Sequence, residues 1–155
     1  MTEIIKNIDY FDFNLTLIRV LKLVGIFENK EKYKLTFKKI VLFDYYLRFP
    51  FMNYNEQKKQ NYDEKYAFFF WKPNYLLYEA VLSVLVSKEF ILYKDDLYKI
   101  KEKGKEALDN MKCSYMDVLS NSGQYILNRV VKLTEKQIEE DIIKKSQDFK
   151  ENING

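Results

Sequence analysis

Few residues in this chain could carry out chemistry. It contains no histidine, and Cys113 is its single cysteine. The commonest general base and the commonest zinc ligand are therefore missing. One cysteine cannot form an internal disulfide, a cysteine-rich metal site or a Cys–His nucleophile pair. The chain has only four glycines, and none belongs to a P-loop or a GxGxxG stretch that would hold a nucleotide.

Two acidic clusters remain as candidate cation ligands. Asp95-Asp96 lies between two short apolar runs, and Glu139-Glu140-Asp141 lies in a highly charged segment near the end of the chain. Carboxylates can bind divalent cations, but the first cluster has the residue types of a tight turn and the second fits a solvated helix face. We therefore predict a protein that is not an enzyme and has no metal and no cofactor.

The elements around which the chain is organised follow residue 73. Apolar residues recur at i, i+3, i+4, i+7 and i+8 within residues 74–87, which predicts a core helix. These residues are Leu77, Ala80, Val81, Val84 and Leu85. Phe90–Tyr93 and Leu97–Ile100 are short aromatic and branched runs on either side of the Asp-Asp turn, and they predict a hairpin. Helical character returns over residues 102–111, so the order is that of the second half of a winged helix.

Further helices are predicted before this core. Residues 14–25 carry a helical apolar face, and residues 36–48 carry another that Thr36 can cap. Residues 33–35 between them could form a short strand. Asp44 and Arg48 lie four residues apart, which predicts a surface ion pair of little energetic consequence. Residues 1–13 are apolar enough either to pack on their own domain or to dock on a neighbour.

The C-terminal part is also predicted to be helical. An apolar face begins near Tyr115, flexible Gly123 lies within it, and residues 134–137 match a capping box. The predicted class is mostly α (α+β): a winged-helix core with a two-stranded wing plus additional N- and C-terminal helices. We expect one domain over residues 1–155, of which about 114–152 form a helical extension.

Composition places few limits on the partners. The chain has 155 residues, 47% of them hydrophobic, and a net charge of +3 that permits contact with nucleic acid without implying it. No apolar run approaches the roughly 18 residues of a membrane span, and no signal peptide is recognisable. These features predict a cytoplasmic protein without a membrane partner.

The segment 49–72 interrupts the predicted pattern. A polar centre rich in tyrosine and asparagine is bracketed by apolar residues, and its length is several times the roughly 3 to 4 residues that join the helices of a helix-turn-helix. The aromatic cluster at its end could be a buried strand or an exposed patch that binds a partner. This cluster is Phe68, Phe69, Phe70 and Trp71.

Several segments resemble the middle component of bacterial ABC three-component systems, to which the accessory subunit of Lamassu-type anti-phage defence belongs. Residues 35–50, LTFKKIVLFDYYLRFP, look like the second helix of that family, with its Asp-Tyr pair at Asp44-Tyr45. Residues 74–119 look like its winged core, in which Ser87-Lys88 precedes the hairpin. The resemblance covers about residues 10–145.

The resemblance implies an adaptor that binds the head region of an SMC- or Rad50-like ATPase. Such an adaptor holds an effector, typically a nuclease, in an anti-phage or anti-plasmid complex whose other subunits are encoded nearby. The competing hypothesis is a winged-helix transcriptional regulator that binds DNA. A regulator needs Arg, Lys, Asn or Gln on its recognition helix, and residues 75–87 contain none of these.

The outward side of the core helix is instead a second apolar row. This row is Tyr75, Tyr78, Leu82 and Val86. It predicts burial against either a protein partner or the chain's own terminal helices. The candidate partner-binding residues are therefore Phe68, Phe69, Phe70, Trp71, Tyr75 and Tyr78.

Lysines gather around the predicted wing. Lys94, Lys99, Lys101 and Lys103 are candidates for nonspecific contact with DNA inside the complex. Six acidic residues interleave with the basic ones from Glu89 to Asp109, so a solvated face is the competing interpretation.

Overall fold

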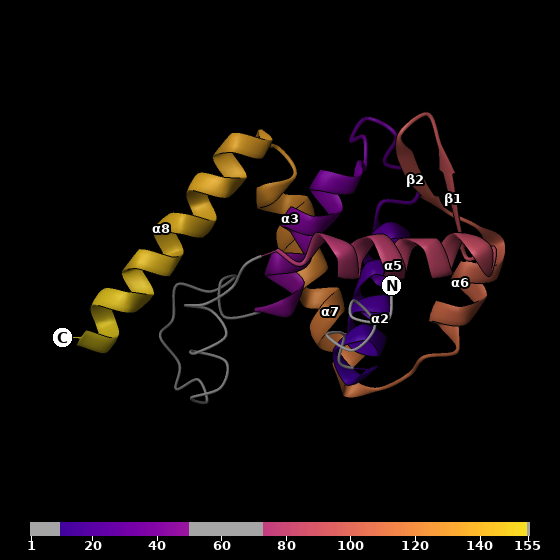
Figure 1. Ribbon diagram of the computed structural model, residues 1–155, viewed down its shortest axis with the longest axis horizontal. Helices are drawn as coiled ribbons and strands as arrows, with labels where there is room; N and C mark the ends of the chain where they lie inside the picture. Colours follow the sequence, from indigo (N-terminus) through magenta and orange to yellow (C-terminus); the bar gives the residue numbers. More distant parts are fainter. Residues whose placement is uncertain (1–9, 50–72, 155) are drawn as a thin grey trace.

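The computed structural model describes residues 10–49 and 73–154. The elements of these ranges are α2 (Tyr10–Ile26), α3 (Phe37–Arg48), α5 (Tyr75–Ser87), β1 (Ile91–Lys94), β2 (Leu97–Ile100), α6 (Glu102–Asp109), α7 (Ser114–Tyr125), the π-helical stretch η2 (Ile126–Val130) and α8 (Glu135–Asn154) (Figure 1). The described chain is thus mostly helical with a two-stranded antiparallel sheet, which confirms the α+β class.

Several element ends form as the sequence predicts. The Thr36 hydroxyl accepts a hydrogen bond from the Lys39 backbone N–H at 3.3 Å, and α3 ends at Arg48. The capping box at the start of α8 is complete. The Thr134 side chain accepts from the Gln137 N–H at 3.2 Å, and the Gln137 side chain accepts from the Thr134 N–H at 2.9 Å. Helix α2, by contrast, begins earlier than predicted and continues past Gly25 to Ile26.

The hairpin has the predicted second strand and turn, and its first strand lies one residue later than predicted, at Ile91–Lys94. Ile91 pairs with Ile100 and Lys94 with Leu97, so Asp95 and Asp96 form a two-residue turn. Both aspartates have positive φ, 54° and 64°, as turns of the primed types require. The predicted strand at 33–35 does not form. One hydrogen bond stands in its place, from the Tyr98 N–H to the Leu35 carbonyl at 3.0 Å.

Helix α6 packs closely on the base of the hairpin. A Cβ at Gly104 would lie 2.2 Å from the Phe90 carbonyl oxygen and 2.8 Å from the Ile100 side chain. Only glycine fits at such a distance from backbone, which offsets its low helix propensity. Gly104 therefore lets α6 hold the hairpin in place.

Helix α2 lies at the centre of the core. It contacts α3, α5, α6, α7 and β2, and α5 crosses it in Figure 1. Its buried residues include Val20, Leu21, Leu23 and Val24. The predicted inner face of α5 is confirmed, since Leu77, Val81 and Leu85 are buried and the alanine and valine between them are half-buried.

The first turns of helix α8 join it to the body. Ile138 and Ile142 are buried in the common core, and the helix contacts α3. The Tyr46 hydroxyl donates a hydrogen bond to Asp141 at 2.7 Å, and the Lys145 ammonium donates to the Tyr125 hydroxyl at 2.8 Å. Beyond this attachment α8 extends away from the other helices (Figure 1).

Replacement of Leu85 by alanine tests the register of α5. Leu85 is fully buried, and deleting such a side chain costs about 2 to 5 kcal/mol through lost transfer energy and a residual cavity. Urea melts should show this loss, whereas Val86→Ala, at the exposed neighbouring position, should change stability by less than about 1 kcal/mol. Equal effects of the two substitutions would contradict the register.

Candidate functional site

A groove runs between the outer side of α5 and the hairpin. Its volume is about 530 Å³. Its lining consists of Phe37, Glu79, Leu82, Ser83, Val86, Ser87, Tyr93 and Tyr98. We call it the hairpin groove. It is bounded by α5 and the hairpin, which correspond to the predicted core helix and wing.

The α5 side of the hairpin groove follows from helical spacing. Glu79, Ser83 and Val86 recur at i, i+4 and i+7, so they share the face of α5 opposite the core. Tyr75, one turn before Glu79, continues this row and lies with its ring centroid 6.3 Å from that of Phe37. Tyr75 is 50% exposed and Val86 38% exposed, so this helix face presents apolar as well as polar side chains to solvent.

The hairpin side follows from strand register. Tyr93 pairs with Tyr98, and residues directly opposite each other project from the same face of a sheet. Their ring centroids are 4.6 Å apart, and both side chains line the hairpin groove. The two tyrosines thus form an aromatic wall opposite α5.

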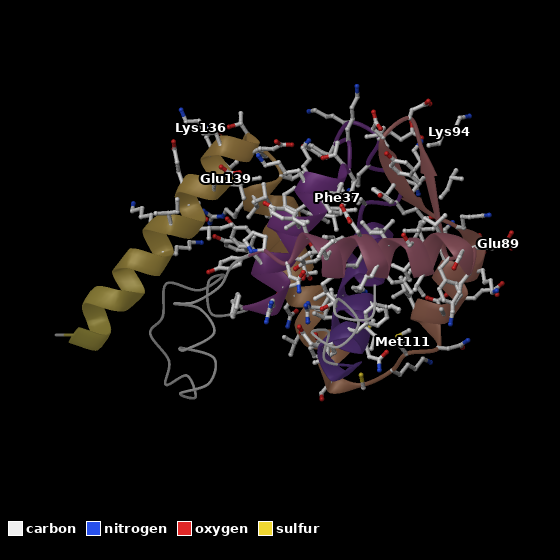
Figure 2. All side chains as sticks on the ribbon, in the orientation of Figure 1. Phe37, Glu89, Lys94, Met111, Lys136 and Glu139 are labelled. Atoms are coloured by element: carbon white, nitrogen blue, oxygen red, sulfur yellow. The ribbon has the colours of Figure 1, made fainter. Side chains whose placement is uncertain are left out.

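The candidate DNA-contacting lysines do not line this groove. Lys94 and Lys99 alternate with the tyrosines along the strands and belong to the other sheet face, with Leu92 and Leu97. Figure 2 shows Lys94 at the outer end of the hairpin and Phe37 beside α5.

The other two candidate lysines lie at the opposite end of the hairpin. Lys101 precedes α6, and the Lys103 ammonium lies 5.4 Å from the centroid of the Phe90 ring. The structure therefore separates the predicted basic patch from the outward face of α5.

One carboxylate dominates the electrostatics of the hairpin groove. Glu79 is the single charged residue of the lining, and no described residue forms an ion pair with it. The pKa of Tyr98 is raised by burial and then by the nearby Tyr93 and Glu79. The pKa of Tyr93 is raised chiefly because its hydroxyl donates a hydrogen bond to Asp96, at 2.9 Å. The groove is therefore aromatic, apolar and weakly negative.

The prediction that Tyr78 is a surface anchor is wrong. Tyr78 and Leu82 are each 2% exposed. Helix α5 packs on α2, and the Tyr78 hydroxyl is bonded to Asp44 of α3, so Tyr78 faces the core. Tyr75 and Val86 of the same predicted row do remain exposed. The candidate cluster at residues 68–71 lies outside the described residues. Of the two predicted partner-binding residues that the structure describes, Tyr75 lies beside the groove through its ring contact with Phe37, and Tyr78 does not.

The Tyr78 hydroxyl belongs to a buried polar network instead. It donates to one Asp44 carboxylate oxygen at 2.5 Å. Arg19 donates to both oxygens of that carboxylate, from Nε at 2.9 Å and from Nη2 at 3.2 Å. Thr16 accepts from Arg19 Nη2 at 2.9 Å and donates to the Asp12 carbonyl at 2.7 Å.

The predicted surface pair between Asp44 and Arg48 is therefore wrong, since Asp44 is fully buried and its ion pair is with Arg19. The network raises the pKa of Tyr78 well above its ordinary value, mainly through burial and then through the Asp44 carboxylate. Every member has a partner, and none lines the hairpin groove. The network is structural, and sequence reasoning missed it because its members lie 25 and 34 residues apart.

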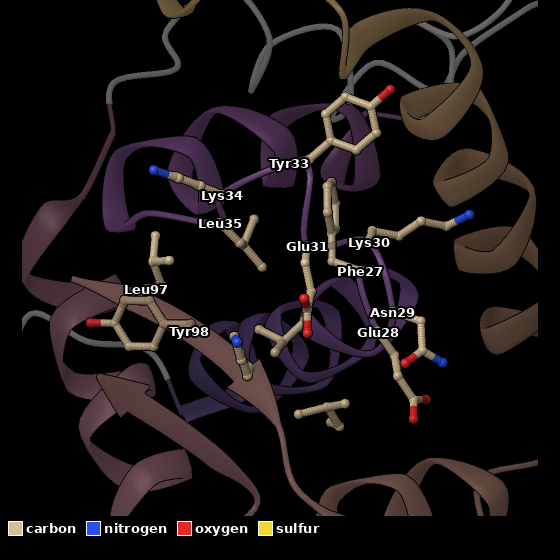
Figure 3. Close-up of a pocket in the computed structure, with 13 residues that line it drawn as sticks. Phe27, Glu28, Asn29, Lys30, Glu31, Tyr33, Lys34, Leu35, Leu97 and Tyr98 are labelled. Atoms are coloured by element: carbon tan, nitrogen blue, oxygen red, sulfur yellow. The ribbon is translucent and has the colours of Figure 1, made fainter. Parts of the chain in front are cut away.

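A second hollow of about 270 Å³ lies between the segment after α2 and strand β2. Figure 3 shows Lys30 and Lys34 extending to opposite sides of it, with Phe27 and Leu35 at its middle. Glu28, in its lining, forms an ion pair with Lys105. The charges of this hollow are mixed and dispersed, so they select no ligand class.

The described residues offer no alternative chemical centre. They contain no group of three or more His, Cys, Asp or Glu side chains that could hold a metal ion. Cys113 is exposed, with a free thiol. None of the helices in the described ranges is both long enough and apolar enough to cross a bilayer.

Comparisons with protein-family models, with characterised proteins and with solved structures give no match to this chain.

Replacement of Asp44 by alanine tests the buried network. The change leaves the Arg19 guanidinium buried without its partner, which typically costs 3 to 5 kcal/mol. Asp109→Ala, at an exposed position at the end of α6, should change stability by about 0.5 kcal/mol or less. Chemical denaturation of both variants measures the difference. Similar midpoints would show that Asp44 does not hold the helices together.

Alkaline unfolding tests the buried tyrosines. Burial is the largest cause of the raised pKa of Tyr45, Tyr46 and Tyr78. Their protons are thus retained in the folded state above pH 10, where unfolded tyrosine ionises. The stability they contribute is complete below about pH 10 and falls above it by about 1.4 kcal/mol per pH unit for each tyrosine. Urea melts at rising pH should show a shallower decline for Tyr78→Phe, and an unchanged slope would contradict the assignment.

Proposed function

We propose that this chain is a non-catalytic, cytoplasmic winged-helix adaptor. It bridges an SMC- or Rad50-like ATPase and a nuclease-type effector in a prokaryotic anti-phage or anti-plasmid defence complex. The order of α2, α3, α5 and the hairpin supports a winged helix with β1 and β2 as the wing. The hydrogen bond from the Tyr98 N–H to the Leu35 carbonyl joins the segment before α3 to the hairpin, which is consistent with this arrangement.

The observation that carries the proposal is the outer face of α5. A DNA reader places side chains that donate to base edges on this helix and cations near the phosphates. Here Tyr75, Glu79, Ser83 and Val86 occupy the face, and the hairpin adds two tyrosines. An open aromatic surface with a single carboxylate suits a protein partner, because interface cores are enriched in aromatic residues and depleted in charge.

The resemblance described above supplies the kind of partner. Its Asp-Tyr pair falls on Asp44 and Tyr45, which are both buried in the core of this chain. The pair thus supports a shared scaffold. The ATPase and the effector are inferred from the resemblance alone.

The alternative is a winged-helix transcriptional regulator. The observation in its favour is that Lys94, Lys99 and Lys103 are exposed. They lie on the far face of the wing or at the start of α6, away from α5, so they suit nonspecific phosphate contact alongside a DNA-clamping ATPase better than base readout.

Binding measurements separate the two functions. We expect weak DNA binding without sequence preference, measured by fluorescence anisotropy at physiological salt across many duplexes, because α5 has no Arg, Lys, Asn or Gln to read bases. A specific dissociation constant in the range of roughly 10⁻⁸ to 10⁻¹¹ M would support the regulator instead.

Co-purification with the ATPase encoded beside this chain tests the adaptor directly. Val86→Asp places a charge in the groove and should weaken the complex at least tenfold, because an unpaired charge in an interface costs more than the roughly 1.4 kcal/mol of one tenfold step. Val118→Asp, at a comparably exposed valine of α7, is the matched control and should bind normally. Both variants should retain the helical circular dichroism of the parent. Normal binding by Val86→Asp would place the interface elsewhere.

A further inference from the structure

We propose that the hairpin groove receives one arginine or lysine side chain of the partner, presented between apolar neighbours. The cation would lie beside Glu79 and against the rings of Tyr93 and Tyr98. This inference rests on the proposed function, since it specifies the chemistry of the protein segment that the adaptor binds.

The first step concerns the Glu79 carboxylate. A partner that covers the groove removes water from Glu79, and burying an unpaired carboxylate is costly. Among the described residues none forms an ion pair with Glu79, and the lining contains no other charge. A partner that brings a cation to this carboxylate would offset the cost of burying it.

The second step concerns Lys38, the cation that follows Phe37, a residue of the groove lining. Its ammonium is already bound to Glu139 at 3.0 Å and Glu135 at 3.7 Å, at the start of α8. These contacts direct Lys38 to α8 and leave the carboxylate of Glu79 for a partner.

The third step concerns the aromatic wall. The ring faces of tyrosine carry negative potential and attract cations, most often arginine. Tyr98 and Glu79 line the same groove, and the Glu79 carboxylate helps to raise the pKa of Tyr98. A cation in the groove could therefore contact both the ring and the carboxylate. Arginine suits this arrangement better than lysine, because its planar group can stack on a ring and donate to a carboxylate at once.

The fourth step concerns the rest of the lining. Phe37, Leu82 and Val86 supply apolar surface around the proposed cation position. A stretch of several basic residues would leave further charges on this surface without partners. One cation between apolar side chains therefore matches the groove, whereas a phosphate backbone would meet Glu79 as a like charge.

The experiment measures the affinity of the co-purified ATPase subunit for purified variants of the full chain. Glu79→Gln should weaken binding about tenfold and Glu79→Lys more strongly, in line with the coupling measured for close charge pairs across interfaces. Glu106→Lys makes the same charge change at an exposed position of α6 and should bind like the parent. For Glu79→Lys the loss of affinity should be larger at low salt, because the new lysine repels the cation of the partner and salt screens this repulsion less.

Charge exchange completes the test. Arginines and lysines of the ATPase subunit are changed one at a time to glutamate. One such change should weaken binding to the parent chain and restore binding to the Glu79→Lys variant. The inference is overturned if Glu79→Lys binds normally while Val86→Asp does not, since the groove would then be used without a cation. It is equally overturned if no exchange restores binding. If the parent chain binds no ATPase at all, the adaptor function itself fails.

Discussion

The buried contact of Asp44 with Arg19 and Tyr78 is the constraint on which the arrangement of the helices depends. It joins α2, α3 and α5 through one fully buried carboxylate. Buried ion pairs contribute little net stability compared with apolar packing, but they require one geometry in which every polar atom is satisfied. The Tyr78 hydroxyl reaches Asp44 only when α5 has one rotation about its axis. Since successive helical residues differ by about 100°, that rotation turns Glu79 and Val86 outward and so defines the hairpin groove.

The second wall of the groove is fixed by backbone rather than by a side-chain network. The aspartates of the turn set the register that places Tyr93 opposite Tyr98. Gly104 allows α6 to approach the Phe90 carbonyl, and the Tyr98 N–H is bound to Leu35. The hairpin is thus attached at its base and along its second strand. The groove is therefore preformed, which lowers the entropic cost of binding a partner there.

Local signals in the sequence predicted local features well. The Thr36 cap, the capping box before α8 and the Asp-Asp turn each depend on residues within four positions of one another, and all three form. The polar network could not be predicted in this way. Asp44 has a suitable cation four residues later at Arg48, and only the packing of α2 against α3 shows that Arg19 takes that role. The burial of Tyr78 could not be predicted either. Most of the surface of α5 is apolar, so its sequence does not show which of its apolar rows packs against other helices.

The chain has a net charge of +3, yet the lining of the hairpin groove contains no lysine or arginine. The positions of the described cations explain this difference. Arg19, Lys38 and Lys105 are held by carboxylates of the chain itself. Lys94 and Lys99 project from the sheet face opposite the tyrosines. Under the proposed function, nucleic acid and a cationic protein segment would therefore approach opposite faces of the hairpin. A partner in the groove would leave the lysines of the opposite face accessible, so the proposed contacts with an ATPase and with DNA would not compete.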